Sequence, residues 1–181
     1  MTLTDQLRGQ YAPGVPETVE VPDQTIPAMV EEVAKRYPHQ IALDFFSRPT
    51  TYAQLMTRVR RAATVLANAG VRQGDRVALA MPNCPQHVVA ILATMHLGAI
   101  VVEHNPLAPD HEIHEEFNRH GARVVIAWEK TLSKLTFLDR GTTVFAVNLT
   151  KALPGPSQLL LKLPIKSART KRDALSTRPP S

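Results

Sequence analysis

The sequence predicts an α/β fold with a mostly parallel sheet and flanking helices. Within Gly70–Trp128, short β-rich apolar runs alternate with helix-length segments, and a glycine stands just before each run. These glycines are Gly74, Gly98 and Gly121. Glycine is favoured where a helix ends and the chain turns back into a strand. Three such returns at near-equal intervals describe consecutive α/β units, whose strands pair in parallel.

The composition indicates one domain with tails. The chain has 181 residues and a single cysteine, Cys84. A chain of this length buries roughly two thirds of its surface on folding, which is enough for a substantial core. One cysteine excludes a disulfide framework and suits a reducing compartment. Because residues 1–20 contain no apolar segment of a secretory signal, we expect a cytoplasmic location.

The net charge of +5 comes from the C-terminal region. Residues 151–181 carry seven basic side chains and one acidic side chain, whereas residues 1–150 carry 14 basic and 15 acidic side chains. The charge pattern therefore gives no support for nucleic-acid binding by the body. We divide the chain into an extended N-terminal arm (1–24), an α/β subdomain (25–150) and a basic, flexible tail (151–181).

The uncharged segment Val77–Val102 has the length of a transmembrane span. Its middle, Pro82–His87, is a loop sequence that lipid does not tolerate when exposed. We therefore predict a strand, a turn, a buried helix, a second turn and a second strand in this segment.

The first part of the subdomain predicts a helix and a hairpin. Apolar residues follow a helical spacing in Ile26–Tyr37, and Pro38 ends that helix. Ile41–Phe46 is a predicted strand, Ser47–Pro49 a turn, and Thr50–Tyr52 a short return strand.

A strongly amphipathic helix follows the hairpin. It begins at Thr51 or Tyr52 and ends at Gly70. Its apolar stripe consists of Leu55, Val59, Ala62, Val65 and Leu66.

The second part of the subdomain alternates strands with helices. The predicted strands are Arg76–Met81, Ile100–Val102, Arg123–Trp128 and Thr143–Leu149. The helix that begins at Pro85 is apolar on most faces and is expected to be deeply buried. The helix Asp110–Arg119 turns Ile113 and Phe117 inward. After Pro156 the regular patterns end.

No phosphate-binding loop is evident. The sequence contains neither GxGxxG nor GxxxxGK[ST], the glycine-rich patterns that present backbone N–H groups to phosphate. Gly141-Thr142-Thr143 runs straight into a predicted strand, and no lysine follows until Lys151. A simple turn is the better interpretation.

Histidines suggest a zinc site, which we weigh against a solvated helix face. His111 and His114 are three residues apart on one helix, with His104 and His120 in flanking segments and Glu115 nearby. A zinc site needs further ligands in place, and the order of residues is neither HExxH nor HxxEH. The solvated helix face is therefore favoured.

Cys84 lies between a strand end and a helix N-terminus, where the helix dipole is expected to lower the pKa of its thiol. No partner histidine is assigned, so a catalytic thiol is the weaker interpretation.

The tail combines the apolar run Leu159–Ile165 with cations up to Arg172. Residues 159–172 therefore suit contact with an anionic membrane surface, and the alternative is a linker.

Ordered sequence motifs resemble the acyl-CoA synthetases, the adenylate-forming ligases. Thr51-Tyr52-Ala53-Gln54-Leu55 matches their TYxEL segment, and Gly70–Ala78 matches GVxxGDRVA. The pattern continues in the same order with Pro82-Asn83-Cys84, Leu97-Gly98-Ala99, Asn105-Pro106, Glu112-Ile113 and Gly121-Ala122. The resemblance covers Ile26–Trp128 and becomes weaker toward Leu149.

The resemblance implies a fatty-acid–CoA ligase of the long-chain kind. Such an enzyme uses ATP and Mg²⁺ to convert a carboxylic acid into an acyl-adenylate and then transfers the acyl group to coenzyme A. The family's phosphate loop ending in Pro-Lys-Gly, its Tyr-Gly-x-Thr-Glu segment and its C-terminal domain do not occur in these 181 residues. We therefore assign no catalytic, cofactor-binding or metal-binding residue, and expect an N-terminal portion that is inactive alone.

Two alternatives stay open. The chain is a non-enzymatic interaction or membrane-docking module derived from such a ligase, or a stand-alone flavodoxin-like nucleotide binder. A sheet that lacks its later strands exposes an edge, so self-association is also expected.

Overall fold

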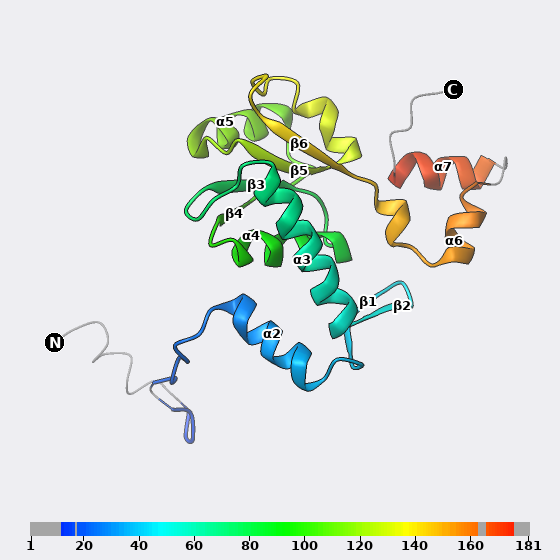
Figure 1. Cartoon of the computed structure of the whole chain (residues 1–181). Coiled ribbons are helices and arrows are strands. Elements are labelled where there is room, and N and C mark those ends of the chain that lie inside the picture. The colour runs from blue at the N-terminus through cyan, green and yellow to red at the C-terminus, as the bar shows by residue number, and fades with distance from the viewer. Residues whose placement is uncertain (1–11, 17, 163–165, 176–181) are drawn as a thin grey trace.

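The computed structural model describes residues 12–16, 18–162 and 166–175 of the chain (Figure 1). The helices are α2 (Ile26–Arg36), α3 (Tyr52–Asn68), α4 (Pro85–His96), α5 (Asp110–His120), α6 (Gly155–Leu160) and α7 (Lys166–Leu175). The strands are β1 (Ile41–Phe45), β2 (Arg48–Thr51), β3 (Arg76–Ala80), β4 (Ile100–Glu103), β5 (Val124–Trp128) and β6 (Thr143–Val147), and the two 3₁₀ helices are η2 (Glu129–Lys134) and η3 (Leu149–Ala152). Of the predicted N-terminal arm, residues 12–16 and 18–24 contain no helix or strand.

The central sheet has four strands in the order β4-β3-β5-β6. All three neighbouring pairs are parallel, with Val77 opposite both Val101 and Val124. The glycines that precede the first three of these strands in the chain, Gly74, Gly98 and Gly121, all have positive φ, between 61° and 83°. The predicted parallel α/β fold is confirmed.

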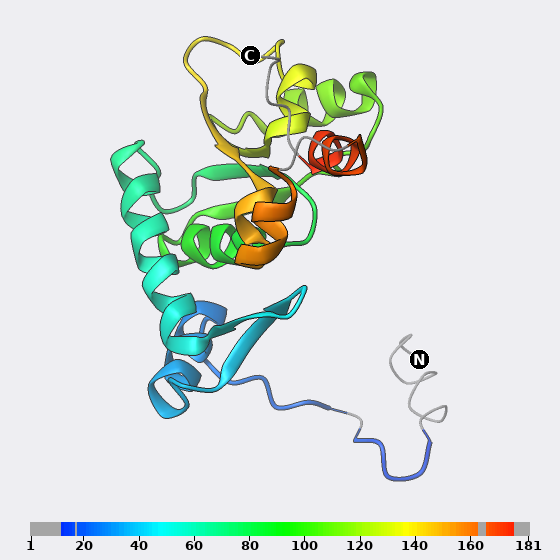
Figure 2. The same cartoon turned by 90° about the vertical axis from the view of Figure 1, so that its right-hand side faces the viewer.

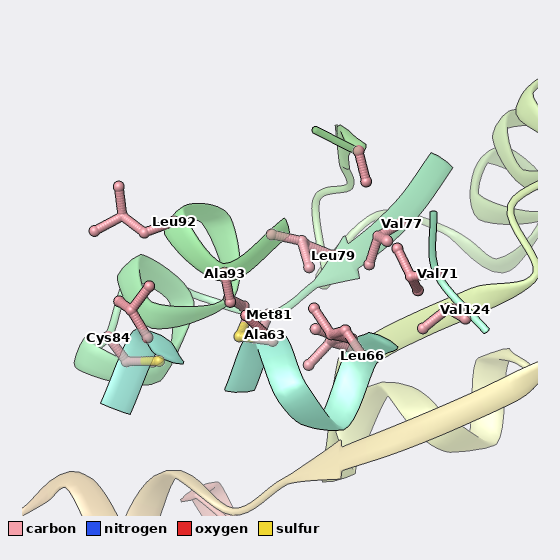
Figure 3. Close-up of a cluster of buried hydrophobic side chains, with 14 of the residues drawn as sticks. Ala63, Leu66, Val71, Val77, Leu79, Met81, Cys84, Leu92, Ala93 and Val124 are labelled. Carbon is pink, nitrogen blue, oxygen red and sulfur yellow. The ribbon is translucent and has the colours of Figure 1, made fainter. Parts of the chain in front are cut away.

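Helices cover both faces of this sheet (Figure 1). On one face α3 and α4 pack against β3 and β5, where Leu66 and Ala93 lie close to Leu79 (Figure 3). On the other face α5 contributes Ile113 and Phe117 to a second apolar cluster. Each cluster excludes water from one side of the strands, and all five residues of β5 are buried.

Helix α3 begins with a capping box. The Thr51 hydroxyl accepts from the backbone N–H of Gln54, and the Gln54 side chain accepts from the backbone N–H of Thr51. Leu55, Val59 and Leu66 are buried as predicted, but Val65 is 49% exposed. The predicted apolar stripe was therefore one residue too wide.

The hairpin turn lies earlier than predicted. β1 and β2 are antiparallel, and Phe45 pairs with Arg48. Only Phe46 and Ser47 form the turn, with φ of 51° and 61°, so Arg48 and Pro49 belong to β2. Two successive residues with positive φ match the right-handed twist of a two-residue hairpin, which explains the shorter turn.

The expectation that regular structure ends after Pro156 is wrong for the described residues. α6 and α7 follow η3 on one side of the molecule (Figure 2). The Arg48 guanidinium ties this region to the hairpin, because its Nη1 donates to the backbone oxygens of Lys151 and Leu153 at 2.5 and 3.0 Å. Leu161, part of the predicted apolar patch, is buried. Residues 163–165 lie outside the described residues, and the flexibility of the tail stays a prediction.

In the part of the chain that the structure describes, no helix combines the length and apolar character needed to cross a membrane. Val77–Val102 instead forms most of β3, all of α4 and most of β4, as predicted from the loop sequence at its centre.

Candidate functional site

The carboxyl ends of the four parallel strands meet at one edge of the sheet. The chain leaves β3 toward β4 on one side and later returns to β5 on the other side, so the connections reverse between β3 and β5. Open α/β sheets bind ligands outside the carboxyl ends of their strands at such a reversal. The polar residues that follow the strands here are Asn83, His104, Asn105, Glu129 and Asn148.

A cavity of about 430 Å³ opens at the carboxyl ends of β3 and β4. Its polar lining consists of Asn83, His87, Glu103, His104 and Asn105. Its apolar lining consists of Met81, Pro82, Pro106 and Leu107. The cavity is therefore a mixed polar and apolar recess whose described lining includes one carboxylate and no lysine or arginine.

An imidazole–carboxylate pair joins two elements beside this cavity. His87, in the first turn of α4, has its Nε2 at 2.8 and 3.0 Å from the two carboxylate oxygens of Glu103, the last residue of β4. The His87 side chain is 11% exposed and that of Glu103 is 48% exposed. Because a carboxylate only accepts, His87 Nε2 carries the proton of this bond. The pair positions the start of α4 against the end of β4.

His104 is the centre of a second hydrogen-bonded chain. The backbone N–H of Ala122 donates to His120 Nδ1 at 3.0 Å, so the proton of neutral His120 is on Nε2. That Nε2–H donates to His104 Nε2 at 2.9 Å. His104 then carries its own proton on Nδ1, which donates to Glu116 Oε2 at 2.7 Å. The four ring nitrogens of His104 and His120 all have a hydrogen-bond partner when both rings are neutral.

The surroundings of His120 oppose its protonation. Burial lowers the pKa of His120, and electrostatic interactions with His104 and Arg76 lower it further, while Glu116 acts in the opposite direction. The His104 ring also stacks on Phe117, with 4.3 Å between ring centroids. This hydrogen-bonded network anchors α5 to the end of β4.

The residues of the zinc site that was weighed and disfavoured are not all brought together. His104 and His120 are in contact, but His111, His114 and Glu115 are exposed on α5. The His114 ring contacts Phe137, with 4.4 Å between centroids. Within the described ranges, no three or more His, Cys, Asp and Glu side chains are placed to hold a metal ion.

Cys84 and the Gly141 turn occupy structural positions. Burial raises the pKa of the Cys84 thiol, although the backbone N–H groups of His87 and Gln86 act to lower it, so the expected lowering is wrong. Thr142 N–H donates to the Asp139 carbonyl at 2.9 Å, which closes a turn that leads into β6. Thr143 already pairs with Val124 in the sheet.

Sequence reasoning missed His87, Glu103 and Glu116 as members of the site. The signal available for Glu103 was its position immediately after an apolar strand, where side chains reach the carboxyl edge. The other two side chains lie on helices, and only the packing of α4 and α5 brings them to the strand end.

Comparison with known proteins gives a consistent family. The sequence pattern of the AMP-binding enzyme family matches residues 30–175. The chain is 28% identical over 157 residues to the long-chain-fatty-acid–CoA ligase of Bacillus subtilis, covering 85% of this chain and 28% of that protein. It is 34% identical over 145 residues to the Salmonella typhimurium protein of the same name, covering 78% of this chain and 26% of the relative.

Solved structures show the same relationship. A benzoate CoA ligase from Burkholderia xenovorans superposes with a TM-score of 0.62 at 25% identity, over 67% of this chain and 25% of that chain. The Klebsiella oxytoca NpsA N-terminal subdomain in complex with 3-hydroxyanthranilyl-AMSN gives 0.61 at 28% identity, over 68% of this chain and 31% of that chain. The chain thus spans less than a third of the length of these relatives. With its sequence and its sheet both matched, the chain belongs to the AMP-binding enzyme family.

Proposed function

We propose that this chain is the N-terminal α/β portion of a long-chain fatty-acid–CoA ligase. The complete enzyme would join a fatty acid to coenzyme A through an acyl-adenylate, with ATP and Mg²⁺ as co-substrates. The observation that carries this proposal is the similarity to ligases of that name over 78–85% of the chain. The strand order and the two covered faces of the sheet support it, because they give the same fold as the matched ligase structure.

Within that enzyme, the described residues act as scaffold. Adenylation needs cations and backbone N–H donors aimed at the phosphoryl groups, where negative charge develops. The cavity at the carboxyl edge does not fit magnesium-bound ATP, since no lysine or arginine lines it and its one carboxylate accepts from His87. The chain therefore contributes a rigid sheet to the ligase and does not complete the reaction alone.

A chimeric enzyme tests the ligase role. The segment of the Bacillus subtilis ligase that matches this chain would be replaced by this chain, and acyl-CoA formation from palmitate, ATP and coenzyme A would be followed. We expect measurable turnover, because the shared fold presents the same scaffold to the remainder of the enzyme. A soluble, folded chimera without activity, beside an active parent enzyme, would contradict the proposal.

The isolated chain gives the complementary result. In the same assay we expect no acyl-CoA and no fatty-acid-dependent release of pyrophosphate above a protein-free control. Robust turnover by the purified chain would show that the chemistry resides in these 181 residues after all.

The second candidate is a docking module at a cytoplasmic membrane surface. It is favoured by Leu159, which is 67% exposed, beside the exposed cation Lys162. Such a pair suits an anionic bilayer. Flotation with phosphatidylserine-containing vesicles should then recover the chain, and Leu159→Ser should reduce the recovered fraction. Equal recovery of both proteins, or none of either, would remove this candidate.

A further inference from the structure

A second cavity lies between the hairpin, the start of α4 and η3. It has a volume of about 320 Å³ and shares no lining residue with the cavity at the carboxyl edge. Arg48 and Thr50 of β2, Arg58 of α3, Gln86 of α4 and Lys151 of η3 provide its polar lining. Its size falls within the range of cavities that hold small ligands.

The charge of this cavity is entirely positive. Arg48, Arg58 and Lys151 line it, and none of the described lining residues is an aspartate or a glutamate. Some other cations of the described residues have carboxylate partners, as Arg60 has in Glu31 and Arg119 in Glu115. The three cavity cations have none within the described ranges. Three cations that converge from separate elements without a counter-ion favour an anionic ligand.

Hydrogen-bond donors remain available on these groups. Arg48 donates from Nη1 to the backbone oxygens of Lys151 and Leu153. The N–H groups of its Nη2 and Nε therefore remain available to a ligand. Arg58 Nη1 donates to Thr50 Oγ1 at 3.3 Å. Thr50 is only 2% exposed, and its own hydroxyl proton has no acceptor among the described residues. The guanidinium contacts fix the donors in place before any ligand arrives.

The side-chain oxygen of Gln86 is a hydrogen-bond acceptor in the lining of the same cavity. Gln86 Oε1 is buried and has no hydrogen-bond donor in the described structure. An unpaired buried amide oxygen is costly, so a ligand that brings a hydroxyl group would stabilise it. Gln86 also lies in the first turn of the 12-residue helix α4, and that turn itself contains no acidic residue.

We propose that this cavity binds a phosphate group carried with a hydroxyl donor, either inorganic hydrogen phosphate or a small hydroxylated phosphate monoester. The two arginines and Lys151 contact the anionic oxygens, Thr50 donates its hydroxyl proton, and Gln86 accepts from the ligand hydroxyl. This site does not depend on the ligase role, because the observations that support it are the charges and hydrogen bonds of these residues alone.

Calorimetric titration of the whole chain with inorganic phosphate and with glycerol 3-phosphate, at about 100 mM salt, tests the site. We expect saturable 1:1 binding of at least one probe. Arg58→Gln and Lys151→Gln should each weaken it about tenfold, the usual loss for a charged hydrogen bond. Gln86→Glu, which has the same shape and adds a negative charge, should abolish binding.

Arg119→Gln is the matched control, because it removes one exposed positive charge from α5 on the opposite face of the sheet. It should leave the affinity unchanged. Amide shifts of the wild-type chain on adding phosphate should centre on Thr50, Gln86 and Ala152, a result that does not depend on any variant folding. The absence of saturable binding of both probes, shifts centred elsewhere, or equal weakening by Arg119→Gln would each overturn the site.

Discussion

At the scale of single residues, the hydrogen bonds that join His120, His104 and Glu116 require one particular protonation state of the two imidazoles. His120 donates from Nε2 only while its Nδ1 accepts from Ala122, and His104 Nε2 accepts only while it is unprotonated. A proton added to either imidazole places two N–H groups against each other or against the Ala122 N–H. The network is therefore most stable when both rings are neutral.

Stability should fall as the solution is acidified through this network. Because the pKa of His120 is lowered in the folded chain, the unfolded chain binds its proton first as pH decreases. The contribution is complete above the unfolded pKa of about 6.5 and is lost as pH falls from there toward the folded pKa. Urea unfolding at pH 7.5 and 5.5 should show a lower free energy of unfolding at pH 5.5.

His120→Gln is the control for this pH dependence, because glutamine does not titrate but retains an N–H donor. The variant should lose less stability between the two pH values than the wild-type chain. An identical loss in both proteins would exclude His120 as the source.

The same residues show how far a sequence locates a site. His104 and His120 drew attention in the sequence only as possible zinc ligands with His111 and His114, an interpretation that the sequence itself disfavours. Helical spacing placed His111 and His114 together on α5, where both are exposed. The contact between His104 and His120 joins a strand end to the last turn of a helix, and that geometry comes from packing of Phe117 against the sheet.

At the scale of elements, the capping box of α3 stabilises the longest helix of the described chain. Thr51→Ala removes the hydroxyl that accepts from Gln54 N–H and should lower the free energy of unfolding by about 1 kcal/mol. Chemical denaturation measures this loss. Thr57→Ala is the control within the same helix, because its hydroxyl bonds only to the Ala53 carbonyl and is exposed. If both variants lose the same free energy, the cap has no special role.

The elements that the sequence predicted well depend on local patterns. α3 and α4 follow from apolar periodicity and first-turn residues, which act within a few positions of each other. The Phe46-Ser47 turn was missed because neither residue is the asparagine or glycine that usually marks positive φ. α6 was missed because Pro154, Gly155 and Pro156 resemble a turn, although proline is tolerated in the first turn of a helix.

At the scale of the whole molecule, β4 and β6 are the two edges of the sheet, since each pairs with only one neighbour. Val144 of β6 is 38% exposed. An open edge with apolar residues favours pairing with another chain, so we expect concentration-dependent self-association in sedimentation velocity runs.

Val144→Lys should reduce this association, because a charge on an edge strand opposes edge-to-edge pairing. Val65→Lys is the matched control, with the same substitution at an exposed position of α3 away from the sheet. A single species for the wild-type chain at all concentrations, or equal effects of the two variants, would show that the edges do not associate.

The strand order also determines when each strand can pair during synthesis of the chain. β3 leaves the ribosome before either of its partners, yet it ends in the middle of the sheet, between β4 and β5. Ala80 meets Ala127 only after both intervening helices have been made. Until then the apolar strand Val77–Ala80 has an unpaired side, and contacts between such distant residues form slowly. The nascent chain is therefore most vulnerable to misassembly in the interval between the emergence of β3 and that of β5.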